Sequence, residues 1–160
     1  MQGSLLQLME RPAVIVPPVV PPSEYPTRIQ RSRRRGAKAP EGSIYVGRPT
    51  MYANPFRSER FGHARSILMY GRWMEARLSD LQLERQGFCP AEIDALHRMR
   101  ERIHRGLPRL HRRNLVCWCP LSSSWCHADI LLRHANDDLP PGFIFVNQPS
   151  PFAKRSKDFW

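Results

Sequence analysis

One segment carries three of the four cysteines of the chain, and it constrains the fold more than any other feature. It reads NLVCWC at positions 114–119 and resumes, after a six-residue turn, as CHAD. Because side chains alternate along a strand, Cys117 and Cys119 share one face with Leu115. Both faces are apolar or carry thiols, which is typical of a strand buried within a sheet. We therefore predict a strand at 114–119 that leads into a helix at 126–135.

Strands and helices alternate along the rest of the folded part. The elements predicted there are, in chain order, a strand at 43–46, helices at 62–80 and 90–106, and a strand at 143–146. The second helix begins at Pro90, which suits a first helical turn, and ends before Pro108. Such alternation favours an α/β fold, as one small layered domain with a short central sheet flanked by helices.

The N-terminal quarter differs in composition from the rest. Residues 1–27 hold six of the sixteen prolines, and the run RIQRSRRRGAK follows at 28–38. Six of the residues in that run are cations, more than half of the net charge of +11. Segments of this composition do not build a packed core. The expected organisation is a disordered Pro-rich and Arg-rich arm at 1–40, a folded domain at 41–146 and a flexible tail at 147–160.

The basic charge favours a polyanionic partner, either nucleic acid or a nucleotide, although a basic run can also simply be solvated. No stretch approaches the roughly 20 apolar residues that a membrane helix needs. The first ten residues make a poor signal peptide. We expect a cytoplasmic protein without membrane contact, in which clustered cysteines bind metal or do chemistry more often than they crosslink. The sequence indicates no particular oligomeric state.

Three interpretations of the cysteine segment stay open. The first is a zinc site with the ligands Cys117, Cys119, Cys126 and His127, although the last two would have to chelate as neighbours in sequence. The second is a catalytic thiol. The third is structural, because cysteine packs well in cores. The phase of the strand makes Cys117 a core residue and leaves Cys119, Cys126 and His127 as the exposed members.

Under the catalytic interpretation the helix N-terminus binds an anion and lowers the pKa of a thiol. The candidate catalytic residues are Cys119, Cys126, His127 and Asp129. Cys126 is the thiol that the helix activates, and His127 acts as acid or base. Asp129 either orients His127 or caps the helix. Ser122 and Ser123 offer donors for a bound phosphate or carboxylate.

Two motifs together resemble those of the DUF4326 family, small uncharacterised proteins of bacteria and their phages. The motifs are YVGRPTMYANPF at 45–56 and LVCWCP with the later CHADIL, and the resemblance covers residues 28–136. The chain departs from the family pattern at Tyr52 and Ala53, where Trp and Gly are expected. The aromatic is kept, but Ala53 loses the freedom for positive φ. The cysteine motif also has a fainter similarity to the DUF488 family. Neither family brings an established reaction.

The family pattern joins both motifs in one domain, which implies a pocket between them. In it, Arg48 would hold an anion, Tyr52 would stack on a base and Asn54 would donate and accept hydrogen bonds. This requires the strand at 43–46 to lie beside that at 114–119. Alternatively, Arg48 and Asn54 only brace the loop.

The resulting function hypotheses belong to different classes. The first is a small enzyme that acts on a nucleotide or a nucleic-acid-linked substrate through the cysteine–histidine turn. The alternative is a zinc-stabilised or purely structural module or adaptor that binds nucleic acid without catalysis. The sequence does not decide between them.

Overall fold

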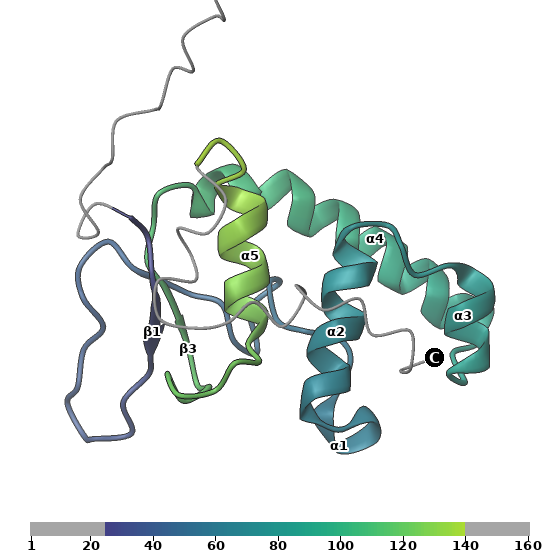
Figure 1. Cartoon of the computed structure of the whole chain (residues 1–160), viewed down its shortest axis with the longest axis horizontal. Coiled ribbons are helices and arrows are strands. Elements are labelled where there is room, and N and C mark those ends of the chain that lie inside the picture. Colours follow the sequence, from purple (N-terminus) through teal and green to yellow (C-terminus); the bar gives the residue numbers. More distant parts are fainter. Residues whose placement is uncertain (1–24, 140–160) are drawn as a thin grey trace, which may run out of the picture.

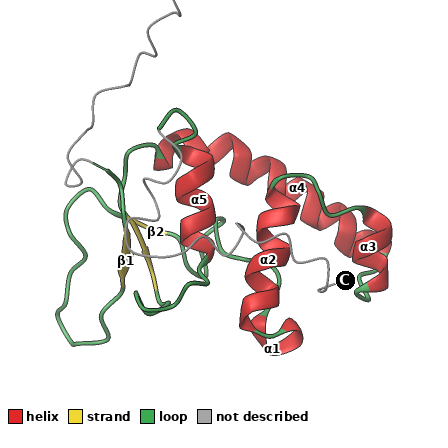
Figure 2. Ribbon diagram, in the orientation of Figure 1, coloured by secondary structure: helices red, strands yellow, loops and turns green. Residues whose placement is uncertain are grey.

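Residues 25–139 are described in the structure, a computed structural model of the chain (Figure 1). The strands are β1 (Arg28–Gln30), β2 (Ile44–Tyr45) and β3 (Leu115–Cys117). The helices are α1 (Ser58–Phe61), α2 (His63–Met74), α3 (Asp80–Arg85), α4 (Pro90–Gly106), the 3-10 helix η2 (Leu107–Leu110) and α5 (His127–Ala135). Strands and helices share one domain (Figure 2), so the predicted α/β fold class is confirmed.

The sheet has three parallel strands in the order β1-β3-β2. All three residues of the central strand β3 are buried, as predicted for this segment. The condition that the strand at 43–46 lies beside that at 114–119 is met, because β2 pairs with β3. Parallel strands end at the same edge of a sheet. The segments that follow β1, β2 and β3 therefore leave this sheet at one edge, where ligands of open α/β sheets gather.

The strand register defines two faces of the sheet. Residues paired across parallel strands point the same way, so Arg28 and Ile44 lie on the face of Leu115, which we call the helix face. Helix α5 packs against this face through β3 and β1. The opposite face carries the neighbours Ile29, Tyr45 and Val116, and we call it the loop face. The loop at 31–43 lies on the side of the sheet opposite to α5 (Figure 1).

Strand β1 lies within the arm that the sequence predicted to be disordered up to residue 40, so that prediction is wrong at Arg28–Gln30. The backbone of β1 is satisfied by β3 and the residues beside it: Asn114 accepts from the Thr27 N–H, and Cys117 accepts from the Arg31 N–H. Arg28 is tolerated in this edge strand because its charge is paired with that of Asp129 on the helix face. The predicted strand at 143–146 and the tail at 147–160 lie outside the described residues.

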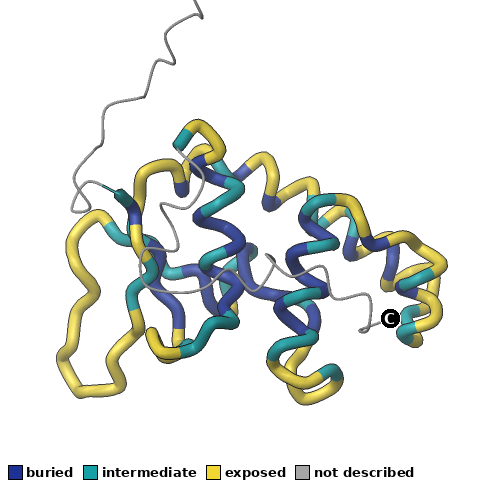
Figure 3. Tube along the Cα trace, viewed as in Figure 1, coloured by how far each residue is buried: buried dark blue, intermediate teal, exposed yellow. Residues whose placement is uncertain are grey.

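The core lies between the sheet and the helices. Its largest fully buried side chains include Phe56, Tyr70 and Trp73, and Phe56 meets Trp73 edge-to-face with ring centroids 5.8 Å apart. Buried positions line the inner sides of α2 and α5, whereas residues 31–42 are all exposed (Figure 3). Helix α2 packs against α5, and α4 packs against α3 and η2. Helix α5 therefore packs against α2 as well as against the sheet.

Two helix predictions had different outcomes. The helix predicted at 90–106 is confirmed at both ends by α4. The helix predicted at 62–80 is too long, because α2 ends at Met74 and Ala76 adopts a positive φ of 55°. A new helix, α3, starts at Asp80, and the hydroxyl of Ser79 accepts from the N–H of Gln82 to cap it. No helix within residues 25–139 is long and apolar enough to cross a membrane.

Candidate metal centre

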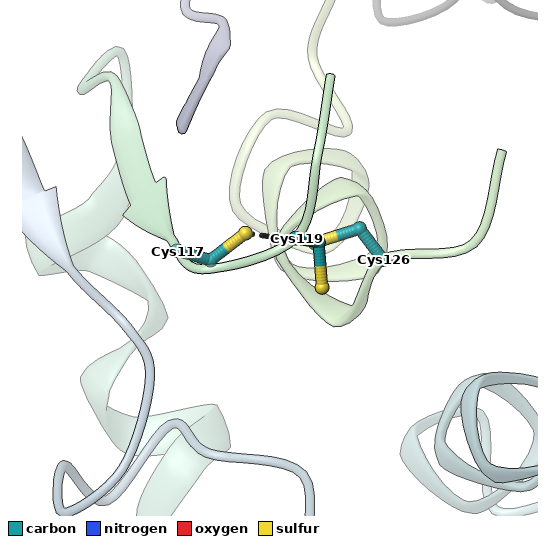
Figure 4. A group of neighbouring side chains, drawn as sticks. All are labelled: Cys117, Cys119 and Cys126. Atoms are coloured by element: carbon teal, nitrogen blue, oxygen red, sulfur yellow. Dashed lines mark hydrogen bonds between the residues drawn. The ribbon is translucent and has the colours of Figure 1, made fainter. Parts of the chain in front are cut away.

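Three thiols meet where β3 ends and α5 begins (Figure 4). The sulfur atoms of Cys117, Cys119 and Cys126 all lie within 4.8 Å of one another, and those of Cys117 and Cys126 are 3.0 Å apart. Cys117 and Cys126 are buried, and Cys119 is the partly exposed member. Among the residues described, this is the one group of three or more metal-binding side chains that converges.

Arg28 organises the turn that brings the thiols together. Its guanidinium donates to the carbonyl oxygens of Pro120, Leu121 and Ser123, at 3.1, 3.2 and 2.9 Å. Its Nε lies 3.1 Å from the Asp129 carboxylate on α5, and only 5% of the Arg28 side chain is exposed. One side chain from β1 therefore fixes both the loop between Cys119 and Cys126 and the start of the helix. Sequence reasoning missed this residue, and its one signal was that the family resemblance begins at position 28.

The three thiols titrate as a group. Hydrogen bonds from Cys119 and Cys126 lower the pKa of the Cys117 thiol well below its usual range. The hydrogen bond to Cys117 raises the pKa of Cys119 to about 11, and the pKa of Cys126 is also raised, by its hydrogen bonds to both other thiols. The anion is therefore stabilised on Cys117, opposite to the predicted activation of Cys126. The reason is that the Cys126 sulfur is buried beside a neighbour that already holds the charge.

His127 does not join the thiol cluster. Its Nε2 lies 3.0 Å from the carbonyl oxygen of Val46, and because a carbonyl only accepts, Nε2 carries the proton. Burial lowers the pKa of the His127 imidazole, which keeps the ring neutral. The predicted exposure of Cys126 and His127 is wrong, since 1% and 9% of these residues are exposed. Cys126 has extended dihedrals (φ −148°, ψ 135°) and His127 is helical, so the two neighbours point to different partners.

Asp129 was predicted to orient His127 or to cap the helix. Its carboxylate instead pairs with Arg28, and 17% of its side chain is exposed. Burial raises the pKa of Asp129 to about 6, although the charge of Arg28 opposes this. Asp129, in the first turn of α5, is thus a group besides the thiols that can bind a proton in this site.

The loop after β2 is braced from within. Arg48 donates to the carbonyl oxygen of Asn54 at 3.0 Å. The Asn54 amide donates to the hydroxyl of Ser66 at 2.8 Å, and its oxygen accepts from the N–H of Phe56 at 2.9 Å. These contacts correspond to the alternative interpretation of Arg48 and Asn54 as a brace.

Tyr52 is a core residue in this loop. It is 7% exposed, and its hydroxyl donates to the carbonyl oxygen of Gly106 at the end of α4. Its ring is therefore turned inward rather than presented for stacking on a base. Ala53, the other departure from the family pattern, does not have the positive φ for which glycine would be needed.

The two serines that were predicted to donate to an anion differ in exposure and in hydrogen bonding. Ser122 is exposed, and it lies in the loop that Arg28 holds. Ser123 is partly buried, and its hydroxyl donates to the carbonyl oxygen of Trp125 at 3.1 Å and accepts from the N–H of that residue. Ser123 is thus used to shape the turn, and donation to an anion stays a prediction for Ser122.

The fold and the site define a small α/β protein with a turn of three thiols at the edge of a parallel sheet. The profile of the family DUF4326, a domain of unknown function, matches residues 29–137. The chain therefore belongs to the DUF4326 family, as the two motifs indicated. No curated protein and no solved structure matches the chain. The similarity to DUF488 stays a resemblance in one motif.

Proposed function

We propose that this protein is a small nucleic-acid-binding module whose fold is stabilised by a zinc ion held by Cys117, Cys119 and Cys126. The observation that carries the proposal is the convergence of three sulfur atoms within 4.8 Å. Thiolates are soft ligands that suit zinc, and the depressed pKa of Cys117 supplies one thiolate before any metal binds. Zinc then displaces the protons of the other two thiols.

Charge balance supports a cation at this place. A divalent ion with three thiolates carries one net negative charge, which is costly to bury alone. Arg28 interacts with Cys117 and Cys126 as well as with Asp129, so a guanidinium stands beside the sulfurs and offsets part of that charge. Within residues 25–139 no fourth metal-binding side chain joins the cluster. We expect a water molecule to complete a tetrahedral site on the side of Cys119.

The polar groups around the thiols are already bonded to other groups of the protein, which favours a stabilising role for the site. Arg28 and Asp129 bind each other, and His127 binds Val46. Groups that are locked in this way hold a fold together but have little freedom to act on a substrate. The net charge of +11 supports nucleic acid as the partner of the module.

Metal analysis of the purified full chain tests the zinc proposal. We expect about one zinc ion per chain. The variants Cys117→Ser and Cys126→Ser should lose the metal, and a chelator should lower Tm by several degrees. Cys89→Ser is the matched control, because Cys89 is an exposed thiol at the start of α4 outside the cluster. Protein that carries no metal and keeps its Tm in chelator would refute the proposal.

A second candidate is an enzyme that acts on a nucleotide or nucleic-acid-linked substrate, with Cys119 as the reactive thiol. The hydrogen bond to Cys117 raises the pKa of Cys119 to about 11, so this thiol would need a nearby base to take its proton. Two observations favour the enzyme candidate: Cys119 is the partly exposed sulfur of the cluster, and the pKa of the nearby Asp129 is raised by burial to about 6, where a carboxyl can exchange protons near neutral pH. Asp129 would then be the proton donor or acceptor rather than His127.

Alkylation by iodoacetamide separates the two candidates. In an enzyme with a free thiol, Cys119 reacts with the reagent and a bound nucleotide slows that reaction, as peptide mass spectrometry would show. In the zinc-bound module, all three clustered thiols are protected while Cys89 reacts. The enzyme candidate would be excluded by two results together: Cys119 is protected until chelator is added, and no nucleotide slows its labelling after that.

A further inference from the structure

The loop face of the sheet holds a second candidate site, away from the thiols. The loop at 31–43 folds over this face and leaves a cavity of about 390 Å³. The lining includes Arg31, Lys38, Tyr45 and Val116. A volume of this size is typical of pockets that hold a small ligand. The thiol cluster does not contribute to the lining, because Cys117 points to the helix face.

Aromatic rings and guanidinium groups alternate along this face. The guanidinium carbon of Arg31 lies 4.6 Å from the ring centroid of Tyr45 and 4.9 Å from that of Trp118. That of Arg33 lies 5.6 Å from the same Trp118 ring. Trp118 is nevertheless 43% exposed, which is unusual for so large an apolar side chain. The rings and cations thus form one surface that is open to solvent.

The cations of this surface lack acidic partners. No carboxylate lines the cavity, and Arg31, Arg33 and Lys38 form no ion pair within residues 25–139. Arg28, from the same basic run, is buried on the helix face and paired with Asp129. The run is therefore divided: Arg28 stabilises the fold, whereas the other cations are exposed, with Arg31 and Arg33 beside the rings. Unpaired cations in a row attract a polyanion.

We infer that this face binds single-stranded nucleic acid, with bases stacked on Trp118 and Tyr45 and phosphates held by Arg31 and Arg33. The inference rests on the proposed nucleic-acid-binding function, and it names the surface and the form of the ligand. Aromatic rings and guanidinium planes both stack on bases, so a base can extend the alternating array. A duplex keeps its bases stacked on each other and cannot use these rings.

The position of Trp118 links this surface to the thiol turn. Trp118 stands between Cys117 and Cys119, so one short segment places sulfur on one face and the indole on the other. The turn that the cluster stabilises therefore also sets where Trp118 stands. This gives the CWC segment a role on each side of the sheet.

Fluorescence anisotropy with the full chain tests the inference, using labelled oligothymidylate about 20 nucleotides long and a duplex of equal length. We expect the single strand to bind more tightly than the duplex. Trp118→Ala should raise Kd about 10-fold, and Trp118→Phe should recover most of the affinity because a ring is restored. Circular dichroism and Tm show whether each variant is folded. The comparison of Phe with Ala keeps the test valid if the alanine variant is unstable.

Salt dependence tests the role of the cations. Replacing both Arg31 and Arg33 with Gln should reduce the slope of log K against log salt by about 1.4, the value for two lost phosphate contacts on a single strand. The control is Arg98→Gln with Arg102→Gln, since both are exposed on α4 and the net charge falls equally. An equal loss in the control would mean that only overall charge matters, which would overturn the inference.

The remaining outcomes separate the inference from the proposed function. If oligothymidylate binds but the Trp118 and Arg31/Arg33 variants match the natural chain, this surface is refuted while nucleic-acid binding stands. Stronger binding of the duplex refutes a single-strand site. If no nucleic acid binds at low salt, or if polyglutamate binds in its place, both the surface and the proposed nucleic-acid function fail.

Discussion

The Nε of Arg28 lies 3.1 Å from the carboxylate of Asp129, and this buried ion pair joins the first described strand to the last helix. The same guanidinium donates to three carbonyl oxygens of the turn between Cys119 and Cys126. Arg28 thus holds the thiol turn closed from the helix face of the sheet. The geometry of the candidate metal centre therefore depends on a residue that is not itself one of the candidate metal ligands.

The first prediction concerns this ion pair. Arg28→Met should lower the free energy of unfolding by about 3–5 kcal/mol, because it leaves the Asp129 carboxylate buried without a partner. A second change, Asp129→Leu, should recover part of the loss by removing the unpaired charge. Urea unfolding followed by circular dichroism measures both values.

Arg77 provides the matched control for Arg28. It pairs with Glu75 at 2.9 Å, but 65% of its side chain is exposed. Arg77→Met should therefore cost less than about 1 kcal/mol. An Arg28→Met variant as stable as this control would show that the pair does not hold the turn.

The second prediction is a pH dependence that arises from Asp129. Burial raises the pKa of this carboxyl from its usual range near 3.9 to about 6 in the folded chain. Between about pH 4 and pH 6 the folded state then binds more protons than the unfolded state. The contribution of Asp129 to the free energy of unfolding must therefore fall as pH rises through that window.

Asp129→Asn isolates this contribution, because the amide keeps the shape of the carboxyl but does not titrate. His127 contributes with the opposite sign, since burial lowers its pKa, so the total curve alone is not informative. The quantity to measure is the difference in Tm between the two proteins at several pH values from 4 to 7. We expect the natural chain to lose stability relative to Asp129→Asn as pH rises, and a constant difference would contradict the raised pKa.

The third prediction concerns the hydrogen bond from His127 to the carbonyl oxygen of Val46, which ties the start of α5 to the end of β2. Glutamine can supply an N–H donor at a similar reach, whereas leucine cannot. His127→Leu should cost about 1–3 kcal/mol for the unsatisfied buried carbonyl, and His127→Gln clearly less. Equal losses in urea unfolding would argue that the imidazole is needed for packing and not for its donor.

The elements that the sequence predicted well are those with a strong local pattern. The apolar spacing after Pro90 and the alternation in NLVCWC each extend over several residues, and α4 and β3 follow from them. Strand β1 has only three residues, and one of its two terminal side chains is a cation, so its pattern resembles that of a solvated run. Its pairing with Leu115 spans most of the folded chain, and no local signal carries such a contact.

The candidate site, too, was predicted only where its residues are close together in the sequence. Convergence of the thiols follows from a strand, a turn and a helix that are adjacent in sequence. The neighbours of Tyr52 and His127 are set by tertiary packing, because Gly106 and Val46 lie far along the chain. An aromatic or a histidine in a loop motif has no local mark that separates a ligand-binding side chain from a buried one. Burial therefore overturned the predicted exposure of His127 and turned the ring of Tyr52 inward.

The last prediction tests the buried contact between Tyr52 and Gly106. The Tyr52 hydroxyl donates to the Gly106 carbonyl oxygen at 3.0 Å, so Tyr52→Phe should cost about 1 kcal/mol. A methyl group added at Gly106 would lie 2.8 Å from the same hydroxyl and would also overlap the end of Met51. Gly106→Ala should therefore cost about 1–3 kcal/mol through overpacking.

The two changes should not be additive, because they share one contact. Once the hydroxyl is absent, the added methyl has one neighbour fewer to displace, so Gly106→Ala should cost less in the Tyr52→Phe protein than in the natural chain. Urea unfolding of the two single variants and the double variant gives the coupling free energy. Additive losses would mean that Met51 alone opposes the methyl group. A double variant that loses less stability than the sum of the two single variants would place the Tyr52 hydroxyl against the end of α4.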